Sequence, residues 1–257
     1  MKKIVVMLMT LTLLLCACDE KTPASELTPN TEPTTPATTE PVTTPTAEPT
    51  TEPTTEPTTA PTTEPASEEN TLSFGRMEGG IYSNSYAGFG CQLNANWSFY
   101  GAQELQELPE LVNGAVEGSD MADLMENYTQ IFDMQAENVN DLLSLNVVYV
   151  KLGIQERLMY AVMTEEQIVD ETLKLKDMMI QAYAQAGMEV TAMEKAKVTF
   201  LGEEHFAIRT LANTQGITVY MLQIIDYNLG SYGMTLTATS YLEDKTQNVL
   251  DMFYTVE

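Results

Sequence analysis

A long run of Thr, Pro and Glu residues decides how much of this 257-residue chain can fold. Between residues 19 and 70 a TEPT-like unit recurs at spacings of four or multiples of four, from Glu32 to Glu64. The run has almost no aliphatic side chains to bury, so it cannot offset the conformational entropy that folding removes. We therefore expect 18–70 to be a disordered, extended stalk and 71–257 to be a single globular domain.

The residues before the stalk have the layout of an export signal. Lys2 and Lys3 precede an apolar segment over 4–15 that is interrupted only by threonines. A helix that crosses the hydrocarbon layer needs about 20 apolar residues, so this segment is too short to span a membrane. We expect 1–17 to be a signal peptide that the mature protein lacks.

The signal ends in two cysteines, Cys16 and Cys18, with Leu15 before the first and Ala17 between them. This stretch resembles the lipobox of bacterial lipoproteins, in which a small residue precedes the modified cysteine. Cys18 fits that position, whereas Cys16 follows the bulky Leu15. The resemblance implies a diacylglyceryl group on Cys18, and two acyl chains hold a protein stably at a membrane. The alternative, a metal or redox pair, would need both thiols to be retained after export.

The implied location is the extracytoplasmic face of the cell membrane, with a lipid anchor. The formal net charge of −25 repels nucleic-acid backbones, so we expect no nucleic-acid partner. The expected partners are membrane lipid, through the acylated Cys18, and an unknown protein or glycan of the cell envelope. Once Cys16 has left with the signal and Cys18 is alkylated, Cys91 is the remaining thiol. We expect it to be buried as a small apolar residue.

The apolar periodicity after residue 70 predicts an α+β domain, in which helices pack on an antiparallel β-sheet. Short β-prone runs punctuated by Gly fill 71–101. Apolar residues spaced for one helix face predict an amphipathic helix from about 119 to 132; they are Met121, Leu124, Met125, Tyr128 and Phe132. A strand follows over 143–152, and 153–162 fits a loop, a short helix or a strand.

The second half of the domain has clearer signals. Thr164 and Gln167 have the spacing of a capping box, which predicts a helix that begins there and ends at Gly187. Alternating patterns and turn residues predict four strands, over 189–201, 204–212, 217–227 and 231–239. A closing helix is expected over 242–254, with Glu243 and Asp244 in its first turn.

Two resemblances bear on the family. The stretches "IYSNSYAGFGCQLNANW", "IFDMQAE" and "VTFLGEEHFAI" resemble small lipoproteins of Gram-positive gut clostridia. The order of an early hairpin ending in Trp, a long central helix, an antiparallel sheet and a terminal helix looks like the PsbP/Mog1-type domain. That resemblance implies an α/β/α sandwich with adaptor-like or binding roles.

The sequence contains few candidate catalytic groups. The single histidine, His205, lies beside Glu203 and Glu204, and a Ser-His-acid triad would have to use it. Without a recognisable nucleophile, we interpret it as a structural turn residue. No zinc, P-loop, Rossmann or nucleophile-elbow pattern occurs, so we expect no cofactor and name no catalytic, cofactor-binding or metal residue.

Three other features suggest chemistry and have simpler interpretations. Oxygen-bearing side chains recur from Asp133 to Asp141, as in a calcium loop, but the EF-hand glycine and glutamate are missing, which favours a helix-to-strand connection. The methionines, among them the pairs Met121, Met125 and Met178, Met179, fall on core stripes rather than forming a copper site. Trp97, Phe99 and Tyr100 could stack on sugars, although a hydrophobic satellite of the core is commoner.

The sequence therefore indicates a membrane-anchored extracytoplasmic lipoprotein whose domain is a non-catalytic binding or scaffold module with an unknown ligand. The alternative is a hydrolase that cleaves cell-wall or other glycans with paired carboxylates, since such chemistry needs only two acids at the right separation.

Overall fold

The structure is a computed structural model that describes residues 75–118, 120–125 and 128–256. The expected signal peptide, Cys16, Cys18 and the stalk lie outside the described residues. No helix within the described ranges is long and apolar enough to cross a membrane.

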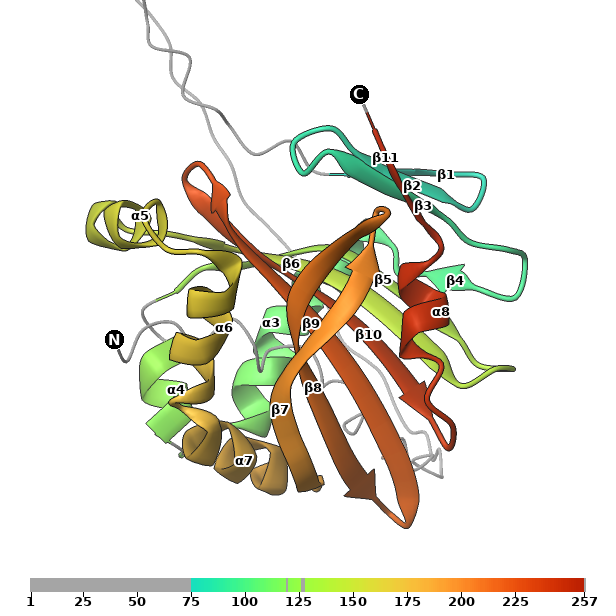
Figure 1. The fold of residues 1–257 in the computed structure, drawn as a ribbon. Coiled ribbons are helices and arrows are strands. Elements are labelled where there is room, and N and C mark those ends of the chain that lie inside the picture. Colours follow the sequence, from blue (N-terminus) through green and yellow to red (C-terminus); the bar gives the residue numbers. More distant parts are fainter. Residues whose placement is uncertain (1–74, 119, 126–127, 257) are drawn as a thin grey trace, which may run out of the picture. The chain divides into compact units, whose positions relative to one another are not determined.

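Seven strands form the main sheet, and every neighbouring pair in it is antiparallel (Figure 1). In spatial order they are β4 (Ser98–Phe99), β5 (Gln130–Asn138), β6 (Leu143–Lys151), β10 (Tyr232–Tyr241), β9 (Ile217–Leu229), β8 (Glu203–Thr214) and β7 (Glu189–Phe200). The strand expected over 143–152 and the four expected over 189–239 are confirmed.

A smaller sheet joins the two ends of the described chain. Its strands, in order, are β1 (Arg76–Glu78), β2 (Ile81–Asn84), β3 (Phe89–Gln92) and β11 (Phe253–Thr255). Phe253 of β11 lies opposite Cys91 of β3 in the antiparallel register. The rings of Phe89, Phe200 and Phe253 pack edge to face, with centroids 5.3 to 5.8 Å apart, and so join the small sheet to β7.

Helices complete the layers. They are α3 (Ala102–Ala115), α4 (Asp120–Met125), α5 (Ile154–Tyr160), α6 (Glu165–Leu173), α7 (Lys176–Gln185) and α8 (Thr246–Leu250). The helices α3, α4, α6 and α7 gather on one side of the large sheet, and α8 and the small sheet lie on the other (Figure 1). The expected class, an antiparallel sheet with helices packed on it, is confirmed.

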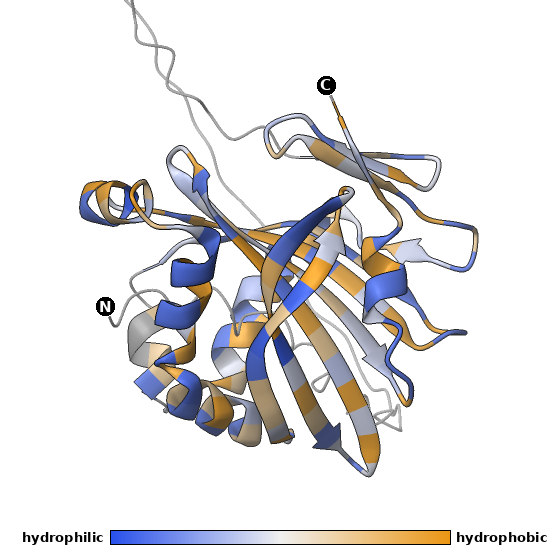
Figure 2. Cartoon of the chain, viewed as in Figure 1, coloured by the Kyte–Doolittle hydropathy of each residue, from blue (hydrophilic) through white to orange (hydrophobic). Residues whose placement is uncertain are grey.

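The core lies on both faces of the large sheet. All residues of β6 from Leu143 to Val150 are buried, as expected for a strand that is covered on both sides. Figure 2 shows apolar residues concentrated along the strands and hydrophilic residues on the outer faces of α6 and α7. In the segment expected to be helical from Thr164 to Gly187, Ile168, Thr172, Met179 and Tyr183 are buried.

The structure contradicts the helix expected over 119–132. Helix α4 ends at Met125, and Phe132 lies in β5. Strand β5 is buried on both faces and has a β-bulge between Phe132 and Met134, which interrupts the strand alternation, and Phe132 also fits a helical spacing from Met125. The helix α3 was not anticipated, although Leu105, Leu108 and Val112 form a buried stripe at helical spacing.

Two further helix predictions need correction. The helix expected from Thr164 to Gly187 is two helices, α6 and α7, because the backbone leaves the helical region at Leu175 (ψ +13°). The helix expected over 242–254 is only the short α8 followed by the strand β11. Asp244 precedes α8 and accepts a hydrogen bond from the Thr246 N–H. The ambiguous segment 153–162 contains the helix α5.

The capping box at the start of α6 is confirmed and yields a stability prediction. Thr164 Oγ1 accepts the Gln167 N–H at 3.2 Å, and Gln167 Oε1 accepts the Thr164 N–H at 2.9 Å. We expect Thr164→Ala to lower the free energy of unfolding by about 1 kcal/mol, because the helix loses one of its N-terminal acceptors. Urea unfolding measures this loss. Thr164→Ser keeps the hydroxyl and should lose little, so equal losses in both variants would contradict the capping role.

Candidate functional site

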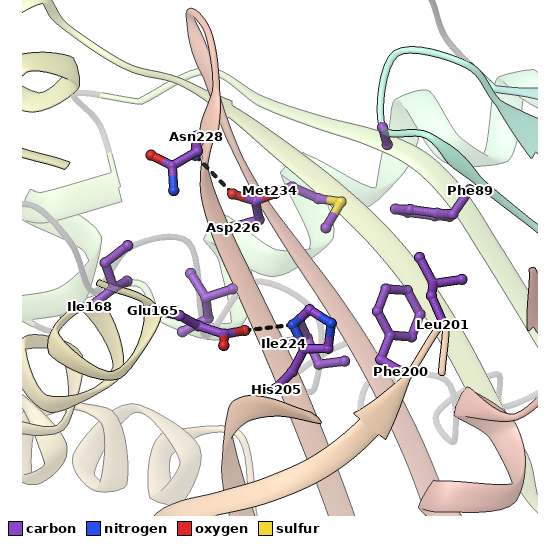
Figure 3. Close-up of a pocket in the computed structure, with 12 residues that line it drawn as sticks. Phe89, Glu165, Ile168, Phe200, Leu201, His205, Ile224, Asp226, Asn228 and Met234 are labelled. Carbon is purple, nitrogen blue, oxygen red and sulfur yellow. Dashed lines mark hydrogen bonds and ion pairs between the residues drawn. The ribbon is translucent and has the colours of Figure 1, made fainter. Parts of the chain in front are cut away.

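A pocket forms where two neighbouring strands of the large sheet part. Strands β8 and β9 pair from Thr214 opposite Ile217 up to Ala207 opposite Ile224, and no farther. Beyond Ala207, β8 continues beside β7 only, and β9 continues beside β10 only. The space of about 320 Å³ between them is lined by Ala87, Phe89, Glu165, Ile168, Phe200, Leu201, His205, Ile224, Ile225, Asp226, Asn228 and Met234 (Figure 3).

Most of the pocket wall is apolar. Phe200 packs edge-on against the His205 ring, with centroids 5.8 Å apart, and Phe89 packs against Phe200. Leu201 lines the pocket from the β7–β8 turn with φ +52°, a conformation that is uncommon for a residue other than glycine. A wall of this kind suits the apolar body of a small organic ligand.

One polar group in the pocket is the pair His205 and Glu165. Glu165 Oε1 lies 2.9 Å from His205 Nδ1, and both side chains are about one-third exposed (Figure 3). An ionised carboxylate can only accept, so the imidazole Nδ1–H donates to it. Nε2 of His205 makes no hydrogen bond to any residue that the structure describes. It is therefore available to a ligand.

The position of Glu165 depends on the attachment of α6 to the sheet. Glu165 is the first residue of α6, directly after the Thr164 cap. Farther along the helix, Glu166 and Asp170 bind Lys195 Nζ of β7 at 2.7 and 2.8 Å. These contacts hold the start of α6 against the β7–β8 hairpin, so that Glu165 can reach His205.

The second polar group is Asp226, on the β9 side of the pocket. Its Oδ1 accepts the Asn228 N–H at 2.8 Å, and it forms no ion pair with any described residue. Burial raises the pKa of Asp226 above its usual range, and the negative charge of Glu165 raises it further, while the Asn228 N–H and His205 oppose the rise. The carboxylate therefore lacks a partner that would stabilise its charge.

The lining groups allow ligand binding and acid–base chemistry, and they disfavour catalysis by a hydroxyl, thiol or amine nucleophile. None of the twelve lining residues is Ser, Thr, Cys or Lys, so the pocket offers no side-chain hydroxyl, thiol or amine as a nucleophile. His205, with its Nδ1–H fixed by Glu165, has the orientation of a general base that could act on water. The arrangement can also hold a small ligand by its polar end.

Of these three polar residues, only His205 was a candidate on the basis of the sequence. His205 is not a simple turn residue, and its partner is Glu165 rather than its neighbours Glu203 and Glu204. Glu165 and Asp226 were missed. Asp226 carried a usable signal, because it is a lone carboxylate within an otherwise mostly apolar strand, where an unpaired charge is costly.

The proposed calcium stretch has a different structure. Asp133 lies in β5, and Asp141 lies in the β5–β6 turn, where its carboxylate accepts the side-chain amide of Asn138 at 2.8 Å. The helix-to-strand connection expected there is therefore wrong, since the stretch is a strand and its hairpin turn. Within the described ranges, no group of three or more His, Cys, Asp or Glu side chains could hold a metal ion.

Other candidates lie in the core. Met121, Met125 and Met179 are buried, and Met178 packs against the core, as predicted. Trp97 is buried, whereas Phe99 and Tyr100 are half-buried, and the Tyr100 hydroxyl donates to Glu137 at 2.7 Å. Cys91 is fully buried, as predicted, and burial raises its pKa to about 12. Its thiol is therefore not a nucleophile at neutral pH.

A buried polar cluster joins the two sheets beside the core. Asp133 is only 3% exposed. It accepts hydrogen bonds from the Gly75 N–H at 2.7 Å, from Asn84 Nδ2 at 2.6 Å and from the Tyr82 hydroxyl. Asn84 Nδ2 also lies 3.3 Å from the Tyr149 hydroxyl of β6. Because its polar atoms are used among themselves, this cluster is structural.

The comparisons with known proteins bear only on the fold. No protein-family model matches the sequence, and no curated protein matches it. Among solved structures, the chain is similar to cyanobacterial PsbP from Synechocystis, with a TM-score of 0.38 and 10% identity over 73% of this chain and 96% of that one. This structural similarity does not indicate a function for this chain. The resemblance to clostridial lipoproteins stays a prediction.

Proposed function

We propose that the protein is a membrane-anchored extracytoplasmic lipoprotein whose domain binds a small ligand, or a small group on an envelope component, in the pocket between β8 and β9. The pocket itself is the observation that supports the binding role. It combines a mostly apolar wall with the polar side chains of Glu165, His205 and Asp226, and its lining offers no side-chain hydroxyl, thiol or amine as a nucleophile. Few, well-placed polar groups in an apolar hollow are typical of ligand sites.

The proposed anchor and stalk give this pocket a place to work. With Cys18 acylated, a stalk of about 50 residues in polyproline II could extend on the order of 150 Å from the lipid surface. The acidic domain would then sample the cell wall while it stays tied to the membrane. Such an arrangement suits a module that captures or presents a ligand in the envelope.

A capture experiment with pocket variants tests the binding role. The tagged full-length protein, cross-linked in the native envelope, should recover one component that is reduced about tenfold by His205→Ala, because the polar end of the pocket is removed. Glu204→Gln is the matched control, since Glu204 precedes His205 on β8 but pairs outward with Lys197. Mass spectrometry measures the recovery. Equal recovery with His205→Ala and wild type would show that binding does not use this pocket.

A glycan hydrolase is the second candidate, and one observation favours it. Two carboxyl groups, Glu165 and Asp226, line one pocket, and burial raises the pKa of Asp226 as in a general acid. A hydrolase would release reducing ends from purified cell walls and lose this activity in Glu165→Gln and in Asp226→Asn. Absence of release by the wild type would leave the binding role as the better account.

A further inference from the structure

The charges in the pocket are unbalanced. The lining contains two carboxylates and one imidazole but no Lys or Arg. Glu165 already has His205 as its partner, at 2.9 Å. Asp226 has only the Asn228 N–H, and no cationic side chain among the described residues pairs with it. A half-buried carboxylate with a single hydrogen bond is an incomplete site, because a desolvated charge needs a countercharge.

We propose that the pocket binds a small organic cation, an amine with an apolar body, whose ammonium group pairs with Asp226 while the body packs against Phe89, Phe200 and Ile168. This inference rests on the proposed binding function and names its ligand class. The ammonium supplies the countercharge that Asp226 lacks, and it can donate up to three hydrogen bonds. His205 Nε2, which has no partner among the described residues, accepts a second of these bonds.

The wall favours an organic cation over a metal ion. Calcium needs six to eight oxygen ligands, and most of the residues that line the pocket with Asp226, such as Ile224, Ile225 and Met234, are apolar. No described group of three metal-binding side chains occurs here or elsewhere. An amine with an apolar body uses both parts of the lining, since its body removes the aromatic and aliphatic walls from water.

The volume of the pocket and the net charge of the chain also favour a small organic cation. The volume of about 320 Å³ holds about ten waters at roughly 30 Å³ each, which corresponds to an amine with one ring or a short chain. The chain carries a formal net charge of −25, so its field draws cations toward the surface and repels anions. The raised pKa of Asp226 agrees with a carboxylate whose negative charge no bound cation stabilises.

Three matched probes test the ligand class on the full-length protein. They are 2-phenylethylamine, its neutral analogue 2-phenylethanol and the anion 3-phenylpropanoate, with Kd measured by calorimetry or ligand-observed NMR at neutral pH. We expect the amine to bind at least tenfold more tightly than the alcohol, and the anion to bind more weakly than either. The tenfold factor follows from one hydrogen bond to a charged group in a pocket.

The variant Asp226→Asn separates charge from shape. It should weaken amine binding about tenfold or more and leave alcohol binding unchanged, whereas Asp226→Glu should retain a preference for the amine. Glu204→Gln, outside the pocket, should change neither Kd. If Asp226→Asn does not fold, as judged by urea unfolding, the ranking of the three probes on the wild type decides the proposal alone.

The outcomes distinguish this inference from the proposed function. Equal affinity for amine and alcohol, no binding of the amine, or an unchanged amine Kd in Asp226→Asn would overturn the assignment of a cationic ligand. The binding role would survive if His205→Ala still reduced capture of an envelope component. Both proposals fail if the amine does not bind and capture is insensitive to His205→Ala.

Discussion

Asp133→Leu should lower the free energy of unfolding by about 4 kcal/mol, because three converging donors would lose their acceptor inside the protein. The donors are the Gly75 N–H, the Tyr82 hydroxyl and the Asn84 side-chain amide. Leu matches the size of Asp approximately but accepts no hydrogen bond. Each stranded donor costs about 1–3 kcal/mol, so the sum is a large share of a typical domain's stability of 5–15 kcal/mol.

The measurement is urea unfolding of wild type, Asp133→Leu and two gentler variants. Asp133→Asn keeps an acceptor oxygen, and Tyr82→Phe removes one donor without removing the ring, so both should lose less than Asp133→Leu. Burial raises the pKa of Tyr82 as well, which keeps its hydroxyl protonated and donating at neutral pH. A loss below about 1 kcal/mol in Asp133→Leu would show that the cluster does not join the two sheets energetically.

The same residue predicts an unusual pH dependence. Burial raises the pKa of Asp133 above its usual 3.8, while the bonds from Tyr82, Gly75 and Asn84 oppose the rise. A folded-state pKa above the unfolded value means that protonation stabilises the fold. The contribution is fully present below about 3.8 and is lost as the pH rises through the raised folded pKa. Relative to Asp133→Asn, the wild type should therefore gain stability as the pH falls through this window.

Cys18→Ser should abolish acylation and release the protein from the membrane fraction. The thioether-linked lipid is the proposed anchor, and two buried acyl chains contribute about 0.8 kcal/mol per methylene, so the loss in membrane partition is many orders of magnitude. Metabolic labelling with a clickable fatty acid and fractionation of the envelope measure both effects. Cys16→Ser is the matched control and should be labelled like the wild type. Equal labelling of Cys18→Ser and wild type would overturn the proposed location.

The elements that could be predicted from the sequence are those with local signals. The four strands after Gly187 alternate over long runs and are separated by turns such as Leu201-Gly202, where both residues have positive φ. The capping box of Thr164 and Gln167 needs only residues three apart. In these segments local propensity and tertiary packing agree, which is why the sequence alone located them.

The errors occur where local patterns were ambiguous. Strand β5 is buried on both faces although it contains the polar residues Asp133, Gln135 and Asn138, so its pattern does not separate a core face from a solvent face. Its apolar Phe132 also fits a helical spacing from Met125. The helix α3 contains Pro109, which weakens a helix signal. The break between α6 and α7 has no Gly or Pro to mark it. It coincides with a tertiary contact, in which Lys176 Nζ donates to the Met193 carbonyl of β7 at 2.7 Å.

The candidate site could not be predicted from the sequence, for a different reason. Glu165, His205 and Asp226 come from one helix and two strands, and none of the three lies beside another in the sequence. The pocket exists because β8 and β9 stop pairing at Ala207 and Ile224, a feature of strand pairing across the sheet rather than of any short motif. His205 therefore becomes part of a pocket only through the tertiary structure.

The pairing of β11 with β3 has a consequence for how the protein is made. Strand β3 is synthesised before every strand of the large sheet, whereas its partner β11, Phe253–Thr255, is synthesised after all of them. Until then β3 has one unpaired edge and Phe89 lacks its partner Phe253, which leaves the nascent polypeptide open to wrong pairing. The small sheet can therefore close only once β11 has been synthesised, so a premature stop codon upstream of β11 would leave that sheet unfinished.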